Sequence, residues 1–166
     1  MNLEFLRNHK IPVETLEKIC ELQTIWPKFN KVPLNADDIA HWAAKMGFRP
    51  VPCRHVARAT TRIISGSRFF LYNPDLPEGE LIYTMSHELC HRVTDNTADE
   101  VIAHIFAYLC RIPQNAMFRL EKKFLWLTPK LVFEHFAPWK MASPQRDIEI
   151  CGQRLEIFAA LYQFPT

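Results

Sequence analysis

The stretch His87-Glu88-Leu89-Cys90-His91 combines residue types that can bind a metal ion and accept a proton. In a helix, two histidines four positions apart leave from one face, so both imidazoles can bind one ion. A Zn²⁺ held by neutral imidazoles with an open coordination position lowers the pKa of its bound water to about 7. Glu88 lies beside this position and could take the proton as water attacks a carbonyl. The spacing therefore predicts His87 and His91 as metal ligands and Glu88 as general base, the logic of H-E-x-x-H zinc peptidases.

A catalytic zinc normally has three protein ligands, so one more is expected. Glu100 is the best candidate because it lies in the first turn of the next predicted helix, which a helical hairpin could bring over the two histidines. Glu100 could instead complete a capping box with Thr97. His104, four positions further on the same face, is the chief rival as ligand. The residues alone leave these alternatives open.

The elements around this motif follow from hydrophobic spacing and breakers. A helix is predicted over 12–26, and a second begins at the cap Asn35, runs to Met46 and ends with Gly47 at C′. Its apolar side is formed by Ile39, Trp42 and Ala43. The motif helix has its own apolar side for the core, including Ile82, Met85, Leu89 and Val93. The next helix opens at 97–100, ends before Pro113 and is expected to pack antiparallel on the motif helix.

A small sheet is predicted from residues 48 to 72. Prolines 50 and 52 favour an edge strand or linker over 48–53. The β-rich runs 59–65 and 68–72 flank Ser65-Gly66-Ser67, which predicts a hairpin. Arg54, Arg58 and Arg62 would form a basic stripe if this stretch were helical instead, but its β-branched residues favour strand.

The sequence after Pro113 is rich in aromatic residues and is predicted to be helical, and the last helix is expected from Pro144 to Tyr162. We therefore predict an α+β fold with a small, mainly antiparallel sheet packed with helices, a zincin-like H-E-x-x-H active-site helix and a helical C-terminal region. Residues 1–166 are expected to form a single metallopeptidase domain. Its core covers about 33–115, preceded by the helix at 12–26 and followed by a helical extension at 116–166.

Composition excludes several classes of function. The chain has 166 residues and a formal net charge of +2, which gives no electrostatic case for direct binding of nucleic acid. Its five cysteines are scattered without a C-x-x-C pair, so neither a disulfide framework nor a cysteine zinc site is predicted. Charged residues interrupt the N-terminus, and no apolar run is long enough to cross a membrane. We expect a cytoplasmic protein.

The chain resembles the ImmA/IrrE family of zinc metallopeptidases over roughly residues 33–115. In that family an F-T-x-x-H-E-L-G-H helix is followed by a helix with E-x-x-A-N-x-F-A ending in L-L-x-P. The matching residues here are Asn73-Pro74-Asp75-Leu76-Pro77, Tyr83-Thr84 with the motif, and then Glu100, Ala103, Phe106, Ala107, Leu109 and Pro113. The resemblance implies His87, His91 and Glu100 as zinc ligands and Glu88 as general base. Two positions depart from the family: Cys90 replaces a glycine, and His104 replaces an asparagine. His104 could then be a hydrogen-bond donor to one of the ligands, an oxyanion stabiliser or an alternative ligand.

The resemblance also implies a function. Members of the family are typically cytosolic site-specific proteases that cleave a repressor, so a partner helix-turn-helix repressor is the expected protein substrate. We expect an extended substrate segment to add as a strand at the sheet edge near 68–72. The alternatives are a toxin–antitoxin component or a zinc-stabilised protein-binding module without turnover. Glu88 favours catalysis, because a structural zinc site needs no base.

Overall fold

The computed structural model describes residues 17, 35–93, 100–112, 114–136 and 143–162. These residues form six α-helices and one three-stranded sheet, which confirms the α+β class. The elements are α3 (Ala36–Lys45), β1 (Arg49–Pro52), β2 (Ala59–Ile64), β3 (Ser67–Tyr72), α4 (Glu78–Val93), α5 (Glu100–Arg111), α6 (Gln114–Lys123), α7 (Pro129–His135) and α8 (Pro144–Tyr162). The helix predicted over 12–26 lies outside the described residues apart from Glu17. None of the described helices is long and apolar enough to cross a membrane.

Helix α3 begins and ends where the sequence predicts. The side chain of Asn35 accepts a hydrogen bond from the backbone N–H of Asp38, and the Asp38 carboxylate accepts one from the N–H of Asn35. This reciprocal capping satisfies two N–H groups that the first turn leaves without helical partners. Gly47 then adopts a φ of +80°, a left-handed conformation that ends the helix and turns the chain into β1.

The sheet has the strand order β1-β3-β2 and is mixed. Strands β2 and β3 form the predicted antiparallel hairpin, which turns through Ser65 and Gly66 with positive φ at both residues. Strand β1 pairs in parallel with the other side of β3, so the sheet has six antiparallel and four parallel residue pairs. The predicted antiparallel part is the hairpin, and the parallel pairing of β1 was not predicted. The connection over 53–58 carries the chain past β3 before β2 begins, which leaves β3 in the centre. Arg62 lies in β2, so the alternative of a basic helical stripe is wrong.

Two prolines occupy the free edge of β1. The backbone N–H of Cys53 donates to the carbonyl of Tyr72 on β3 at 2.8 Å. Because N–H groups alternate along a strand, the N–H groups of Arg49 and Val51 also face β3, and the nitrogens of Pro50 and Pro52 face away from it. Proline has no hydrogen to donate, so this edge lacks half of the groups that a further strand needs. Among the described strands, β2 therefore offers the one edge suited to pairing.

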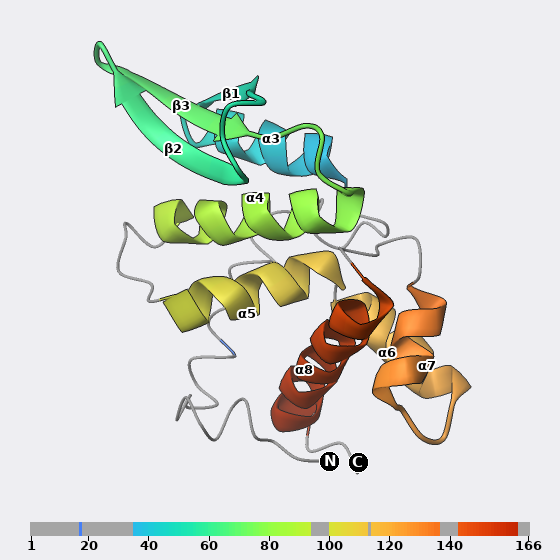
Figure 1. Ribbon diagram of the computed structural model, residues 1–166. Helices are drawn as coiled ribbons and strands as arrows, with labels where there is room; N and C mark the ends of the chain where they lie inside the picture. Colours follow the sequence, from blue (N-terminus) through green and yellow to red (C-terminus); the bar gives the residue numbers. More distant parts are fainter. Residues whose placement is uncertain (1–16, 18–34, 94–99, 113, 137–142, 163–166) are drawn as a thin grey trace.

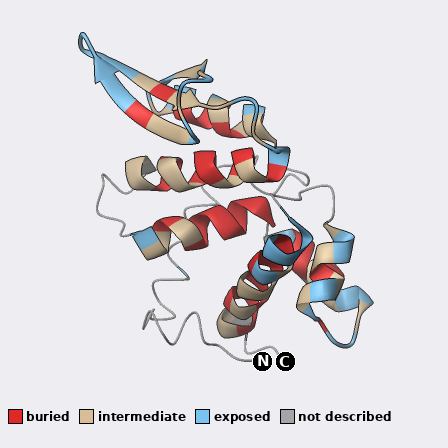
Figure 2. Cartoon of the chain, in the orientation of Figure 1, coloured by how far each residue is buried: buried red, intermediate tan, exposed pale blue. Residues whose placement is uncertain are grey.

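Helix α4 lies between two layers, with the sheet and α3 on one side and the antiparallel α5 on the other (Figure 1). Its residues Ile82, Met85 and Leu89 are buried in the main core, as the apolar spacing predicts. Figure 2 shows buried residues running along both α4 and α5. Because α4 is central, side chains of both the sheet and α5 can contact its polar residues.

Helix α8 joins the main core to a second apolar cluster. Its Ile150 and Ile157 belong to the first cluster, whereas Leu155 and Phe158 pack with residues of α6 and α7. The guanidinium of Arg154, fully buried, donates to the carbonyl of Ile112 just after α5, at 2.8 Å. These contacts fix α8 against the end of α5.

A buried ion pair strengthens the same junction. Arg111 at the end of α5 and Asp147 in the first turn of α8 lie 2.7 Å apart, with side chains 3% and 1% exposed. A buried charge is tolerated only when it is paired. The helical region after Pro113 is thus tied to α5 by polar contacts as well as by apolar packing.

Candidate metal centre

Helices α4 and α5 bring three of the predicted ligands into contact. The Nε2 atom of His87 lies 3.3 Å from Nε2 of His91, one helical turn further along α4. Glu100, the first residue of α5, contacts both rings: Oε2 is 3.1 Å from Nε2 of His87, and Oε1 is 3.4 Å from Nε2 of His91. The carboxylate reaches across from the helix that packs antiparallel on α4. The predicted juxtaposition of Glu100 with the two histidines is therefore present.

These separations fit a single metal ion. When bonds of about 2.0–2.1 Å point to the corners of a tetrahedron, neighbouring ligand atoms lie about 3.3 Å apart. The three measured separations of 3.1, 3.3 and 3.4 Å bracket this value. Two imidazole nitrogens and a carboxylate oxygen offer lone pairs, and converging lone pairs need a proton or a cation between them. The three residues can thus hold one metal ion from one side.

Burial keeps His87 in the form that binds metals. Loss of solvent lowers the pKa of His87 to about 4, with a further contribution from the neighbouring His104 ring, while Glu100 acts in the opposite direction. At neutral pH the ring is uncharged, so one nitrogen keeps its lone pair. The other nitrogen, Nδ1, is buried and has no hydrogen-bond partner among the described residues.

Glu88 lines the same cavity as His87, Glu100 and His104. This cavity has a volume of about 320 Å³, and we call it the metal cavity; its described lining is Arg58, Ala59, Tyr83, Thr84, His87, Glu88, Glu100 and His104. Burial raises the pKa of Glu88, and the nearby charges of His91 and Arg92 only partly offset this effect. A carboxylate with a raised pKa is a better proton acceptor near neutral pH. Glu88 is thus in position to accept a proton inside the metal cavity.

His104 belongs to this site as well. Its ligand atom, with those of His87 and Glu100, forms a group within 4.8 Å of one another that could hold a metal ion. Its ring lies 4.6 Å from the His87 ring, centre to centre. Burial lowers the pKa of His104, so its uncharged form is favoured. His104 could thus join His87 and Glu100 in holding an ion.

Tyr83 is a member of the site that the sequence did not single out for chemistry. Its hydroxyl is hydrogen-bonded to Nδ1 of His104, and the two rings are stacked. Tyr83 also contacts the ring of Tyr108. The sequence does contain a signal for Tyr83, because it precedes His87 by four residues, the same spacing that separates His87 from His91. Extending the polar stripe of α4 by one turn would have found it.

Two other sequence-based expectations can be compared with the site. Cys90 is fully buried in the main core, so its thiol is enclosed by apolar packing. Thr97, the proposed capping partner of Glu100, lies outside the described residues.

The prediction that substrate adds at a sheet edge near 68–72 is wrong. Residues Phe69–Tyr72 of β3 are paired on both sides, with β1 and with β2, and offer no free edge. The free edge next to the metal cavity is that of β2, whose first residue, Ala59, lines the cavity.

Comparisons with protein-family models, with curated proteins and with solved structures found no match to this chain.

Proposed function

We propose that this chain is a zinc-dependent metallopeptidase of the ImmA/IrrE type. The observation that carries the proposal is the convergence of His87, His91 and Glu100 at separations of 3.1–3.4 Å. Two histidines and one glutamate form a ligand set of catalytic zinc sites, which leave the fourth position open. Imidazole favours zinc over calcium or magnesium, which prefer oxygen ligands. The presence of Glu88 in the same cavity favours hydrolysis over a purely structural role.

Glu88, His104 and Tyr83 of the metal cavity would each have their own role in peptide hydrolysis. A zinc ion held there would polarise a substrate carbonyl and lower the pKa of water to about 7. Glu88 would take the proton from the attacking water and deliver it to the leaving amine, because its raised pKa suits both transfers. His104, fixed by Tyr83, would donate a hydrogen bond to the oxygen on which negative charge develops.

The substrate proposed is an extended segment of a protein. The free edge of β2 begins at the metal cavity, so a peptide could pair with β2 and place a carbonyl above the histidines. A flexible linker can adopt this shape without the unfolding of a domain. On the resemblance to repressor-cleaving peptidases, the partner is a helix-turn-helix repressor, cleaved between its DNA-binding and oligomerisation parts.

The test pairs two substitutions on one helix. Glu88→Gln keeps the shape of the side chain and cannot accept a proton, so it should retain zinc and cut repressor cleavage by about a hundredfold or more. Glu78→Gln, an exposed change at the start of α4, is the matched control and should leave cleavage unchanged. Each variant would be co-expressed with a candidate helix-turn-helix repressor, and fragments would be read by mass spectrometry. Equal cleavage by Glu88→Gln and wild type would remove Glu88 from the mechanism.

A zinc-stabilised binding module without turnover is the second candidate. It is favoured by one observation, the position of His104 in the group that could hold an ion. If His104 supplied a fourth protein ligand, the zinc would have no open position and would be structural. A repressor that stays intact but forms a stable complex with zinc-loaded protein would support this candidate.

A further inference from the structure

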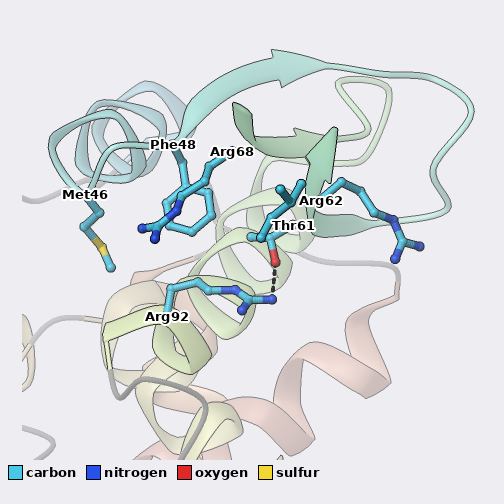
Figure 3. Close-up of a pocket in the computed structure, with 7 residues that line it drawn as sticks. Met46, Phe48, Thr61, Arg62, Arg68 and Arg92 are labelled. Atoms are coloured by element: carbon cyan, nitrogen blue, oxygen red, sulfur yellow. Dashed lines mark hydrogen bonds between the residues drawn. The ribbon is translucent and has the colours of Figure 1, made fainter. Parts of the chain in front are cut away.

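A second and larger cavity lies beside the metal cavity, beneath the end of the hairpin. It has a volume of about 840 Å³, and its described lining consists of Met46, Phe48, Thr61, Arg62, Ile63, Arg68 and Arg92. Figure 3 shows that the labelled residues come from the end of α3, from the sheet and from α4, and that the Arg62 side chain points away from Arg68. We call it the arginine groove. None of the metal ligands lines it.

The lining combines positive charge with apolar surface. Three of its seven described residues are arginines, and none is acidic. Arg62 pairs with Phe69 and therefore projects from the opposite face of the sheet to Arg68, so Arg68 and Arg92 supply the positive charge inside the groove. The Arg68 guanidinium lies 5.9 Å from the centre of the Phe48 ring, which holds it over an aromatic face. Arg92 donates a hydrogen bond to the hydroxyl of Thr61, which fixes its position between α4 and β2. Ile63 is 73% exposed, a large apolar side chain left open to solvent at the rim.

We propose that the arginine groove binds an extended peptide segment that carries acidic side chains next to apolar ones. Arginine pairs strongly with carboxylates, and the apolar lining suits aliphatic side chains. The adjacent edge of β2 offers backbone groups with which an extended peptide can pair. A peptide is favoured over nucleic acid because binding of a phosphate backbone needs a long basic surface, whereas the formal net charge of this chain is only +2.

The groove continues the path of the proposed substrate, and this step rests on the proposed function. Ala59 of β2 lines the metal cavity, and Thr61 and Ile63 of the same strand line the groove. Residues two positions apart in a strand are separated by about 7 Å, so the groove begins at Thr61, about 7 Å along β2 from Ala59 in the metal cavity. On α4, Glu88 and Arg92 are separated by about 6 Å along the axis. The groove would thus select acidic residues two to four positions from the cleaved bond.

Fluorescence anisotropy can measure the binding directly. The probe is a short fluorescein-labelled peptide in which Glu alternates with Leu, and the protein is the Glu88→Gln variant, so that hydrolysis cannot consume the probe. Adding Arg68→Gln and Ile63→Ser, which pair across β2 and β3 on one face of the sheet, should together weaken binding about tenfold, because one charge-assisted and one apolar contact are lost. Both side chains are exposed, so the fold should persist, and circular dichroism and zinc content would verify this.

The matched control is Arg49→Gln. Arg49 belongs to the same sheet but pairs with Phe69, whose side chain lies on the opposite face from that of Arg68. This control should change the affinity by less than about twofold, since only general electrostatics is altered. A peptide with Gln in place of every Glu should bind about as weakly as the original probe binds to the double variant.

Several outcomes would overturn the proposal. Equal affinity for the Glu and Gln peptides, or unchanged binding by the double variant, would remove the groove as an acidic-peptide site. Displacement of the probe by a single-stranded oligonucleotide at a lower concentration than by unlabelled peptide would assign the groove to nucleic acid. Groove-dependent binding with no hydrolysis of the probe or of the repressor by wild type would support the groove and count against peptidase activity. Hydrolysis by the double variant with an unchanged KM would leave the peptidase intact and remove the groove.

Discussion

The hydroxyl of Tyr83 on α4 and Nδ1 of His104 on α5 are joined by a hydrogen bond beside the candidate ligands. His104 also belongs to the group with His87 and Glu100 that could hold a metal ion. A histidine oriented in this way can serve either as a ligand or as a hydrogen-bond donor to substrate. Two substitutions separate these roles.

Tyr83→Phe removes the hydrogen bond and retains the ring. If His104 acts on substrate, zinc content should stay at about one per chain while kcat falls about 10- to 100-fold with little change in KM. Tyr72→Phe, on β3, is the control for loss of a tyrosine hydroxyl elsewhere in the core. Loss of zinc from Tyr83→Phe would instead assign His104 to the ion.

The identity of the third ligand can be tested by metal analysis. Glu100→Ala should abolish stoichiometric zinc binding, because Glu100 is the residue that contacts both His87 and His91. His104→Ala should retain zinc with lower activity. His41→Ala, an exposed change on α3, should alter neither. A zinc-replete Glu100→Ala protein together with a zinc-free His104→Ala protein would transfer the ligand role to His104.

The buried ion pair between α5 and α8 predicts a large effect on stability. Asp147→Ala leaves Arg111 charged and buried, so the free energy of unfolding should fall by about 3–5 kcal/mol. Glu149→Ala is the matched control, because it breaks the exposed Arg146–Glu149 pair and should cost less than about 1 kcal/mol. Urea denaturation measures both. Equal losses in the two variants would mean that burial does not strengthen the Arg111–Asp147 contact.

The thiol of Cys151 should be unreactive in the folded protein. Burial raises its pKa to about 12, and the lowering effect of Arg111 offsets this only in part. The reactive thiolate is therefore scarce at pH 8. Iodoacetamide at this pH should modify Cys53, which is half-buried, and spare Cys151 until urea unfolds the chain. Peptide mass mapping reads the modification, and labelling of folded Cys151 at the rate of Cys53 would contradict the assignment.

The same pKa shift has a consequence for stability. The unfolded thiol ionises near pH 9, whereas the folded thiol keeps its proton until about pH 12. The stabilisation from Cys151 is therefore present below pH 9 and is lost as the pH rises from 9 to 12. Cys151→Ala should show a shallower loss of stability over this window.

Features set by neighbouring residues in the chain could be predicted from the sequence. The cap at Asn35, the end at Gly47 and the hairpin at Gly66 depend on local conformation, and all three are present. His87 and His91 share a helix face because of their spacing alone. The short connection to the next helix predicted its antiparallel packing on α4, but the residues alone left open whether Glu100 or His104 is the third ligand.

Features that depend on distant parts of the chain escaped prediction. The side of β3 on which β1 pairs is decided by the path of residues 53–58, and no local pattern encodes it. The hydrogen bond between Tyr83 and His104 requires the relative rotation of two packed helices. The arginine groove brings together Arg68 of β3 and Arg92 of α4, which no single periodic element could have indicated.

The prolines on the outer edge of β1 limit how the sheet can grow. Strand addition needs alternating donors and acceptors, and Pro50 and Pro52 remove the donors from one side. Among the described strands, only β2 can accept another strand, and β3 is enclosed. A sheet with one usable edge can take a single peptide, or close against a second copy of itself, but it cannot polymerise. The chain can therefore keep one edge open for substrate without the risk of fibre formation that sheets with two open edges carry.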